Sequence, residues 1–324
     1  MRLLVTGGAG FIGSNYVRWV LQHTDDEVTV YDALTYAGNL STLADVEQNY
    51  GSRYRFVHAD ICDLDAFSTA VAGHDAVLHF AAESHVDRSI TGPAAFTITN
   101  CVGTNVVMHA SRLAEIPRVV HISTDEVYGS VEEGESLETD LLDPRSPYSA
   151  SKAGSDLIAR SYFSTYELPV MVTRASNNFG PWQYPEKVIP LFSTNLLDGA
   201  KVPLYGDGLN RRDWLHVLDH CAGIDVVLRR GDPGEIYNIG AGNELSNFDL
   251  THRLLGLAGA GEDRIERVAD RLGHDRRYCV DSTKLQALGW SPERDLDGAL
   301  ADTFAWYRDN RWWWEPLKAA SPAR

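Results

Sequence analysis

Three glycines near the start of the chain restrict its fold more than any other feature. Gly7, Gly10 and Gly13 follow a short apolar run at residues 3–6 and open an amphipathic stretch. Glycines at this spacing permit a tight turn, close approach of the backbone to a pyrophosphate, and close packing of a helix on a strand. The helix N-terminus beyond them offers unpaired N–H groups and the positive end of the helix dipole to phosphates. The segment therefore predicts a dinucleotide site rather than a simple turn.

The first half of the chain continues this strand–helix pattern. Short apolar runs at residues 3–6, 28–32, 55–58, 76–80, 119–123 and 170–174 lack a period-two alternation, as parallel strands buried on both faces do. Helical patterns at 12–21, 94–115 and 148–166 lie between them. These observations predict an α/β chain, a Rossmann doubly wound parallel sheet with a smaller C-terminal substrate-binding domain. We expect the dinucleotide domain at 1–175, with 213–240 returning to it, and the second domain mainly at 176–324.

The acidity of the chain restricts its partners. The 324 residues include 29 Lys and Arg against 45 Asp and Glu, a formal net charge of −16. This charge disfavours nucleic acids and anionic membrane surfaces as partners, since both need a basic face. Neither a signal peptide nor a transmembrane run is evident, and the four scattered cysteines are typical of a reducing compartment. We therefore expect a cytoplasmic protein without a metal site, and local cations for any anionic ligand.

An acidic residue ends the second expected strand. Asp32 lies 19 residues after Gly13, where a carboxylate would hydrogen-bond the adenosine ribose of a dinucleotide. No arginine occurs among residues 33–36, so a 2′-phosphate would meet a carboxylate without a compensating cation. The pattern favours NAD over NADP.

A tyrosine and a lysine point to redox chemistry. Tyr148 and Lys152 are four residues apart at the start of an expected helix, which puts their side chains on one face. A nearby ammonium favours tyrosinate and would lower the pKa of the phenol toward the operating pH. Such a tyrosine can take a proton from a substrate hydroxyl while hydride leaves the same carbon.

With the glycine turn, this pair resembles the extended short-chain dehydrogenase/reductase family. Seven further blocks are similar to the dTDP-glucose 4,6-dehydratases within it, at residues 32–39, 81–89, 123–129, 176–181, 185–187, 206–214 and 273–278. The resemblance covers residues 6 to about 280. It implies a hydro-lyase with tightly held NAD, commonly a homodimer, that converts dTDP-glucose to dTDP-4-keto-6-deoxyglucose. The implied steps are C4 oxidation, loss of water across C5 and C6, and hydride return to C6.

The segment Thr124-Asp125-Glu126 distinguishes dehydration from related reactions. It follows an expected strand, so it lies at the carboxyl edge of the sheet, where α/β sites form. Dehydration needs an acid for the leaving C6 hydroxyl and a base for the C5 proton, and two carboxyls with pKa values pushed apart can divide these roles. The chemistry alone leaves the division open. The resemblance assigns the acid to Asp125, the base to Glu126, and a hydrogen bond to the C4 oxygen to Thr124.

The resemblance also implies binding positions. Those for NAD include Tyr148 and Lys152, together with Gly7, Gly10, Phe11, Ile12, Gly13, Asp32, Ala33, Leu34, Thr35, Asp60, Ile61, Phe80, Ala81, Ala82, Ser84, Thr99 and Asn178. Those for the nucleotide sugar are Ser84, Thr124, Asn177, Lys187, Val188, Pro203, Tyr205, Arg212, Asn243, Arg271 and His274. A planar guanidinium such as that of Arg212 suits phosphate geometry.

Other functions remain open alternatives. A nucleotide-sugar 4-epimerase shares the fold, NAD, Tyr148 and Lys152, but it does not need Asp125 and Glu126. A decarboxylase acting on a sugar acid would have no use for an acid such as Asp125. A non-catalytic NAD-binding sensor would tolerate loss of Tyr148 or Lys152, and both are present. Leu272, Trp182 and Ala175 depart from the family pattern, and the acidic segment 132–143 is short, so the strictness of substrate preference stays open.

Overall fold

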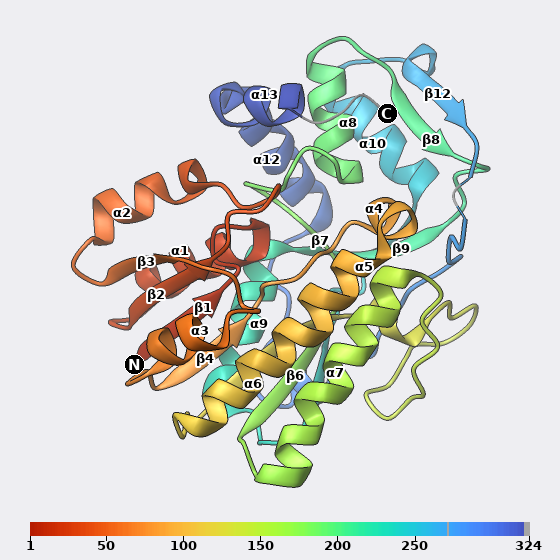
Figure 1. Cartoon of the computed structure of the whole chain (residues 1–324). Helices are drawn as coiled ribbons and strands as arrows, with labels where there is room; N and C mark the ends of the chain where they lie inside the picture. The colour runs from red at the N-terminus through yellow and green to blue at the C-terminus, as the bar shows by residue number, and fades with distance from the viewer. Residues whose placement is uncertain (271, 321–324) are drawn as a thin grey trace.

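Seven parallel strands form the central sheet of the computed structural model, which describes residues 1–270 and 272–320. Their order is β10-β6-β5-β4-β1-β2-β3, and Figure 1 shows the sheet with helices on its two faces. The strands are β1 (Arg2–Thr6), β2 (Glu27–Asp32), β3 (Tyr54–His58), β4 (Ala76–His79), β5 (Val119–Thr124), β6 (Val170–Ala175) and β10 (Ile236–Ile239). Six of them match the runs expected from the sequence, and the α/β class is confirmed. The seventh, β10, comes from the segment 213–240, while the domain boundary itself stays a prediction.

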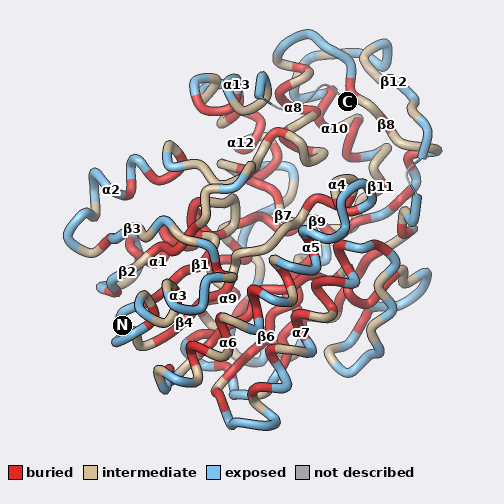
Figure 2. The backbone as a smooth tube through the Cα atoms, in the orientation of Figure 1, coloured by how far each residue is buried: buried red, intermediate tan, exposed pale blue. Residues whose placement is uncertain are grey.

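Two layers of helices bury the sheet, and Figure 2 shows the strands as the buried centre of this region. Every residue of β5 and β6 is buried, which explains their continuous apolar character. Helices α1 (Phe11–His23) and α9 (Val217–Arg230) supply the core on one face. Helices α3 (Leu64–Val71), α6 (Thr104–Leu113) and α7 (Pro147–Tyr166) supply it on the other.

The start of α7 is fixed by its own sequence. Ser146 and Ser149 form a reciprocal capping box, and Pro147 occupies the first turn, where it has no N–H to leave unpaired. This cap places Tyr148 and Lys152 in the first two turns of the helix, behind the carboxyl end of β5. Shorter helical elements on the same half are η1 (Leu40–Leu43), α2 (Ala44–Tyr50), α4 (Val86–Thr91) and η3 (Asp125–Tyr128).

The helix expected at 94–115 differs from the structure in its interior. It consists of α5 (Pro93–Phe96), the π-helical segment η2 (Thr97–Gly103) and α6. A π-helical turn inserts a residue into the regular ladder and is frequent at functional sites. Thr99 lies within this π-helical segment and lines a cavity described below.

The second half of the chain builds a smaller region above the carboxyl ends of the strands (Figure 1). Strands β7 (Asn177–Phe179), β9 (Arg211–His216) and β11 (Glu244–Ser246) form one small sheet, and β8 (Val202–Tyr205) pairs with β12 (Ile265–Val268). Helices α8 (Val188–Leu197), α10 (Asn247–Ala258) and α12 (Leu296–Asp309) enclose its apolar core. The remaining elements are η4 (Glu262–Arg264), α11 (Thr283–Gln286) and α13 (Arg311–Ala320).

Helix α13 joins the two halves. Trp313 and Trp314 are buried, and the Trp313 Nε1 donates to the Thr42 hydroxyl at 3.1 Å, across to the first half of the chain. Trp312 stays exposed. Among the described residues, none of the helices combines the length and the apolar character that crossing a membrane requires.

Candidate active site

The glycine turn after β1 leaves room for a ligand at the carboxyl edge of the sheet. Gly7 has φ +68°, and a Cβ on Gly13 would lie 2.3 Å from the Gly7 carbonyl oxygen, so neither position accepts a side chain without strain. The turn opens a cavity with about 1310 Å³ of empty space, which we call the cofactor cavity. Gly7 and Gly13 leave its wall without side chains there, so a pyrophosphate could approach the backbone closely.

Asp32 lies at the rim of the cofactor cavity and is 8% exposed. Its two oxygens accept hydrogen bonds from the backbone N–H groups of Ala9 at 2.9 Å and Leu34 at 2.8 Å. Burial raises the pKa of this carboxyl, and the two N–H donors oppose that rise. Because a carboxylate oxygen has a second lone pair, Asp32 retains capacity to accept a ribose hydroxyl.

The structure brings most of the expected NAD positions to this cavity. Those that line it are Gly7, Gly10, Phe11, Ile12, Gly13, Asp32, Ala33, Thr35, Asp60, Ile61, Phe80, Ala81, Ala82, Ser84, Thr99, Tyr148 and Lys152. Two expected positions do not. Leu34 contributes its backbone N–H to Asp32, and Asn178 lines the neighbouring cavity instead, its amide oxygen held by His220 at 2.9 Å.

Tyr148 and Lys152 line the cofactor cavity together, as their spacing predicts. The Lys152 ammonium donates to the Ile122 carbonyl of β5 at 2.8 Å. Burial lowers the pKa of Lys152 to about 8. The pKa of Tyr148 is raised, by burial first and by the charge of Glu126 second, with a hydrogen bond to Thr124 opposing the rise. The expected lowering of the phenol's pKa by Lys152 is therefore absent from the protein alone, because burial and nearby carboxylates outweigh the ammonium.

The segment Thr124-Asp125-Glu126 forms the turn between β5 and η3. The Thr124 hydroxyl donates to Asp125 Oδ1 at 3.2 Å and accepts from the Glu126 N–H at 3.2 Å, which fixes the turn. Asp125 is 3% exposed, and its Oδ2 has no hydrogen-bond partner within the described part of the chain. Burial, and then the charge of Glu126, raise the pKa of Asp125 well above its usual range. This shift favours the protonated form of Asp125, which can act as an acid.

A second cavity opens beside the first, and we call it the substrate cavity. It has about 1000 Å³ of empty space, and Gln183, Glu186 and Lys187 line both cavities, so the two adjoin. Glu126 lines the substrate cavity, whereas Tyr148 and Lys152 line the other. A molecule in the substrate cavity can thus reach the carboxylate turn and the redox pair from one side.

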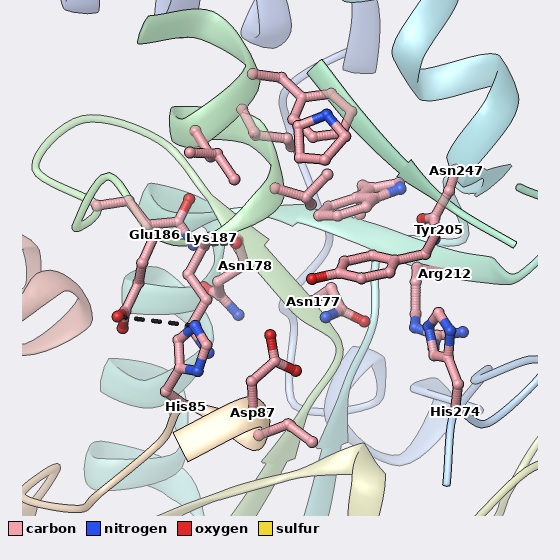
Figure 3. Close-up of a pocket in the computed structure, with 18 of the residues that line it drawn as sticks. His85, Asp87, Asn177, Asn178, Glu186, Lys187, Tyr205, Arg212, Asn247 and His274 are labelled. Carbon is pink, nitrogen blue, oxygen red and sulfur yellow. Dashed lines mark hydrogen bonds and ion pairs between the residues drawn. The ribbon is translucent and has the colours of Figure 1, made fainter. Parts of the chain in front are cut away.

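The expected sugar-nucleotide positions fall partly on this second cavity. Asn177, Lys187, Val188, Pro203, Tyr205, Arg212 and His274 line it, and Figure 3 shows Arg212, Tyr205 and His274 together at one end and Lys187 at the other. Arg212 comes from β9 and is 5% exposed; its guanidinium donates to the Asp275 carbonyl at 2.9 Å. Ser84 lines the cofactor cavity, and Thr124 lies in the turn below. Arg271 lies outside the described residues.

Asn243, another expected position, lines neither cavity. Its backbone N–H donates to Asp213 at 2.7 Å and its side-chain amide to the Trp214 carbonyl at 3.4 Å, so it fastens the residue before β11 to β9. Asn247, the first residue of α10, lines the substrate cavity instead and stands beside Tyr205 and Arg212 in Figure 3. The sequence holds two asparagines four residues apart, and only the packing of α10 distinguishes them.

Two further groups at the site were not among the expected binding positions. The Tyr278 phenol donates to Asp275 at 2.5 Å, and its ring lies 4.3 Å from the Arg212 guanidinium. Glu186, on the wall shared by the cavities, accepts from the Tyr36 phenol at 2.9 Å and lies 3.7 Å from His85, the dashed pair in Figure 3. His85 also caps α4, its Nδ1 accepting from the Arg88 N–H at 3.3 Å. Both Tyr278 and Glu186 lie inside sequence blocks that carry the family resemblance.

Known proteins give an independent comparison. The GDP-mannose 4,6 dehydratase family model matches residues 4–303. A dTDP-glucose 4,6-dehydratase of Streptomyces niveus is 53% identical over 329 residues, which cover 100% of this chain and 97% of that protein. The chain belongs to the dTDP-glucose 4,6-dehydratase family. A dTDP-glucose 4,6-dehydratase of Streptomyces venezuelae, solved with NAD bound, is 55% identical and superposes with a TM-score of 0.96 over 98% of this chain and 100% of that one.

Members of a neighbouring family have the same fold with less sequence in common. A UDP-glucose 4-epimerase of Thermus thermophilus, solved in complex with NAD, is 29% identical with a TM-score of 0.88 over 96% of this chain. The fold alone therefore does not separate a dTDP-glucose 4,6-dehydratase from an epimerase. The separating features are local, and the carboxylate turn at Asp125 and Glu126 is the one with a direct chemical consequence.

Proposed function

We propose that this chain catalyses the NAD-dependent 4,6-dehydration of dTDP-glucose to dTDP-4-keto-6-deoxyglucose. The carrying observation is the turn of Asp125 and Glu126: Glu126 lines the substrate cavity, Asp125 is buried beneath it, and the charges of both act on Tyr148 of the adjoining cofactor cavity. An epimerase uses only the redox pair Tyr148 and Lys152. A dehydratase needs this pair and the two carboxyls within reach of one sugar ring.

The cofactor cavity fits NAD. Gly7 and Gly13 leave backbone exposed where a pyrophosphate can approach, and Asp32 keeps an acceptor for a ribose hydroxyl. NAD, when bound, supplies the hydride acceptor for the sugar and the hydride that is later returned to it. Tyr148 and Lys152 complete the wall of the same cavity, so the proton and the hydride leave the sugar at one place.

The first proton movements follow from these positions. Tyr148 acts as its phenolate and takes the proton of the C4 hydroxyl as the hydride leaves C4, and the Thr124 hydroxyl turns from Asp125 to donate a hydrogen bond to the C4 oxygen. The C4 ketone that results makes the C5 proton acidic. Glu126 then removes this proton. Asp125, buried and protonated, gives its proton to the C6 hydroxyl, which leaves as water.

The last step restores the enzyme. The hydride taken from C4 is returned to C6, and Glu126 gives its proton, which can exchange with solvent, to C5. Tyr148 then loses its proton and Asp125 regains one through solvent. No net oxidation occurs, so the reaction is a lyase reaction although its first step is a dehydrogenation. Arg212 provides a positive charge for the diphosphate within an otherwise acidic chain, and Lys187 places a second one at the opposite end of the substrate cavity.

We further propose that the chain forms a homodimer through the outer faces of α6 and α7. Leu113 of α6 and Leu157 and Tyr166 of α7 are each more than half exposed, and Ile98 and Val102 of η2, the segment before α6, are at least half exposed. The two helices pack side by side, so a second copy can match the same stripe with its own. A Leu113→Glu and Leu157→Glu double variant is expected to elute as a monomer, and an unchanged dimer would contradict this interface. The cytoplasmic location stays a prediction.

One incubation tests the proposed reaction. Purified protein is mixed with dTDP-glucose and catalytic NAD in deuterated water. The proposal expects a product lighter by one water that carries solvent deuterium at C5. A product of unchanged mass would indicate epimerisation, and the absence of turnover would favour a sensor.

A further inference from the structure

A fully buried ionic cluster lies behind the cofactor cavity, and the proposed reaction does not use it. We call it the Asp156 cluster, and it consists of Asp156, Arg174, His121 and Tyr128. The Arg174 Nε donates to Asp156 Oδ2 at 2.9 Å, and the His121 Nε2 lies 3.3 Å from Asp156 Oδ1. The Asp156 and Arg174 side chains are 0% and 1% exposed. A buried charge pair is costly to assemble, so its place beside the active site requires an explanation.

The cluster lies next to the catalytic lysine. Asp156 follows Lys152 by one turn of α7, so the two side chains project from the same face of the helix. The Lys152 and Asp156 side chains contact two consecutive residues of β5, Ile122 and His121. Lys152 donates to the Ile122 carbonyl at 2.8 Å, and Asp156 faces the His121 ring at 3.3 Å.

The cluster also reaches the carboxylate turn. The Arg174 Nη1 donates to the Tyr128 phenol oxygen at 2.8 Å, and Tyr128 is the last residue of η3, the element that begins with Asp125 and Glu126. Tyr128 in turn donates to Asn238 of β10 at 2.8 Å. Arg174 therefore connects the helix that carries the redox pair with the turn that carries the acid and the base.

We propose that Asp156 is a positioning residue for the reaction: its carboxylate, held by Arg174 and next to His121, is the counter-ion that keeps the buried Lys152 positively charged. The inference rests on the proposed function for its consequence in catalysis. The electrostatic claim concerns only Lys152 and the groups around it.

The charges that face Lys152 support this role. Burial lowers the pKa of Lys152 to about 8, and Asp156 is the first group that opposes the fall, followed by Cys101 of η2. His79 and His121 also face it, and burial lowers the pKa of each, so both are neutral at physiological pH. Burial alone would raise the pKa of Asp156, but the hydrogen bond from His121 and the charge of Arg174 lower it, so Asp156 stays ionised.

The charge of Lys152 can be measured directly. The sequence has five lysines, at positions 152, 187, 201, 284 and 318. In protein labelled with ¹³C-lysine, NMR titration of the five side-chain signals gives each pKa, and a Lys152→Met variant assigns the signal of Lys152. The signals of the other four lysines report whether each variant below is folded.

Two variants that remove the negative charge by different routes form the test. Asp156→Asn removes it directly and keeps the shape, so the pKa of Lys152 is expected to fall by about one unit, a tenfold change in its protonation equilibrium. Arg174→Gln removes the positive charge that keeps the buried Asp156 ionised, so Asp156 takes up a proton and the pKa of Lys152 is expected to fall here too. Arg174→Lys keeps the charge and serves as the matched control, with a pKa close to that of the unaltered protein.

The outcomes are separate from those of the proposed function. A fall in the pKa of Lys152 in both Asp156→Asn and Arg174→Gln, and none in Arg174→Lys, supports the role of Asp156, whereas no shift or a rise overturns it. Should Asp156→Asn fail to fold, the Arg174→Gln and Arg174→Lys pair decides, and no fall in Arg174→Gln overturns the proposal. In Asp156→Asn, the alkaline limb of kcat/KM is expected to move to lower pH by the same amount. A protein that does not turn over dTDP-glucose would refute the proposed function, and the NMR titration would still decide the inference.

Discussion

The cofactor cavity and the substrate cavity adjoin, yet they are built in different ways. The cofactor cavity gathers residues from the carboxyl ends of neighbouring parallel strands, from Gly7 after β1 to Asp32 at the end of β2 and Phe80 after β4. The substrate cavity gathers residues from α8, β8, β9 and α10, which belong to different small sheets and helices. A parallel sheet fixes where its strand ends meet, whereas the second cavity depends on how separate elements pack. Because the two cavities are built from different elements, a substitution in one cavity should affect the binding of one ligand only.

The chemistry is divided in the same manner. Tyr148 and Lys152 face the cofactor cavity, and Glu126 faces the substrate cavity. If this division holds, changes at the carboxylate turn should stop elimination without stopping oxidation. Changes in either cavity should weaken one ligand and leave the other unaffected.

The largest effect is expected from removing both carboxylates of the turn. In the Asp125→Asn, Glu126→Gln double variant, single-turnover loss of water should slow by about 10³-fold or more, because no group is left to move either proton. NADH absorbance should still appear, since Tyr148 and Lys152 are intact. The control is Glu132→Gln with Glu133→Gln on the exposed acidic segment. Elimination at an unaltered rate would remove Asp125 and Glu126 from the mechanism.

A smaller effect is expected at the diphosphate end of the substrate cavity. Arg212→Gln should raise KM for dTDP-glucose by about 100-fold, because a charged hydrogen-bond donor contributes about 1.5–3 kcal/mol and Arg212 is buried at the wall. The dissociation constant of NAD should not change. Arg211→Gln is the matched control, because Arg211 is the next residue along β9 and its side chain is exposed and pairs with Glu244. An equal loss of NAD affinity would show that the two cavities are not separate binding sites.

The reciprocal change lies in the cofactor cavity. Asp32→Asn should weaken NAD binding about 10-fold, since an amide is a poorer acceptor for a ribose hydroxyl than a carboxylate. Binding of dTDP, measured by calorimetry, should be unaffected. Asp65→Asn, an exposed carboxylate on α3, controls for the change in net charge. Weaker dTDP binding in Asp32→Asn would contradict the claim that the two cavities bind their ligands separately.

The smallest effect separates the two asparagines near β11. Asn247→Ala should raise KM for dTDP-glucose about 5-fold, the cost of one neutral hydrogen bond of about 1 kcal/mol. Asn243→Ala should leave KM unaltered and lower thermal stability slightly, because the Asn243 side chain donates to the Trp214 carbonyl of β9 and lines neither cavity. The reverse pattern in KM would restore Asn243 as the ligand of the nucleotide.

These expectations also show how far the sequence could predict the molecule. Six strands of the sheet, the glycine turn and the spacing of Tyr148 and Lys152 follow from local patterns, because strand and helix periodicity and backbone approach are local properties. The residues that line the substrate cavity could be predicted only from the family resemblance, because nothing in the composition around Pro203 or Tyr205 indicates a ligand.

The pKa of Tyr148 also could not be predicted from local sequence. The sequence argument considered the ammonium of Lys152 alone and expected it to lower the pKa of Tyr148. In the folded chain, burial and Glu126 raise that pKa instead. The Asp156 cluster was missed for the same reason, since its members come from β5, β6, η3 and α7 and meet only in the tertiary structure.

The central claim is that one sugar is oxidised, dehydrated and reduced without leaving these two cavities. It is tested most directly with dTDP-glucose deuterated at C4, incubated with the protein and catalytic NAD in ordinary water. The account predicts a product lighter by one water in which the deuterium has moved from C4 to C6. Deuterium retained at C4, in a product that has lost no water, would contradict it.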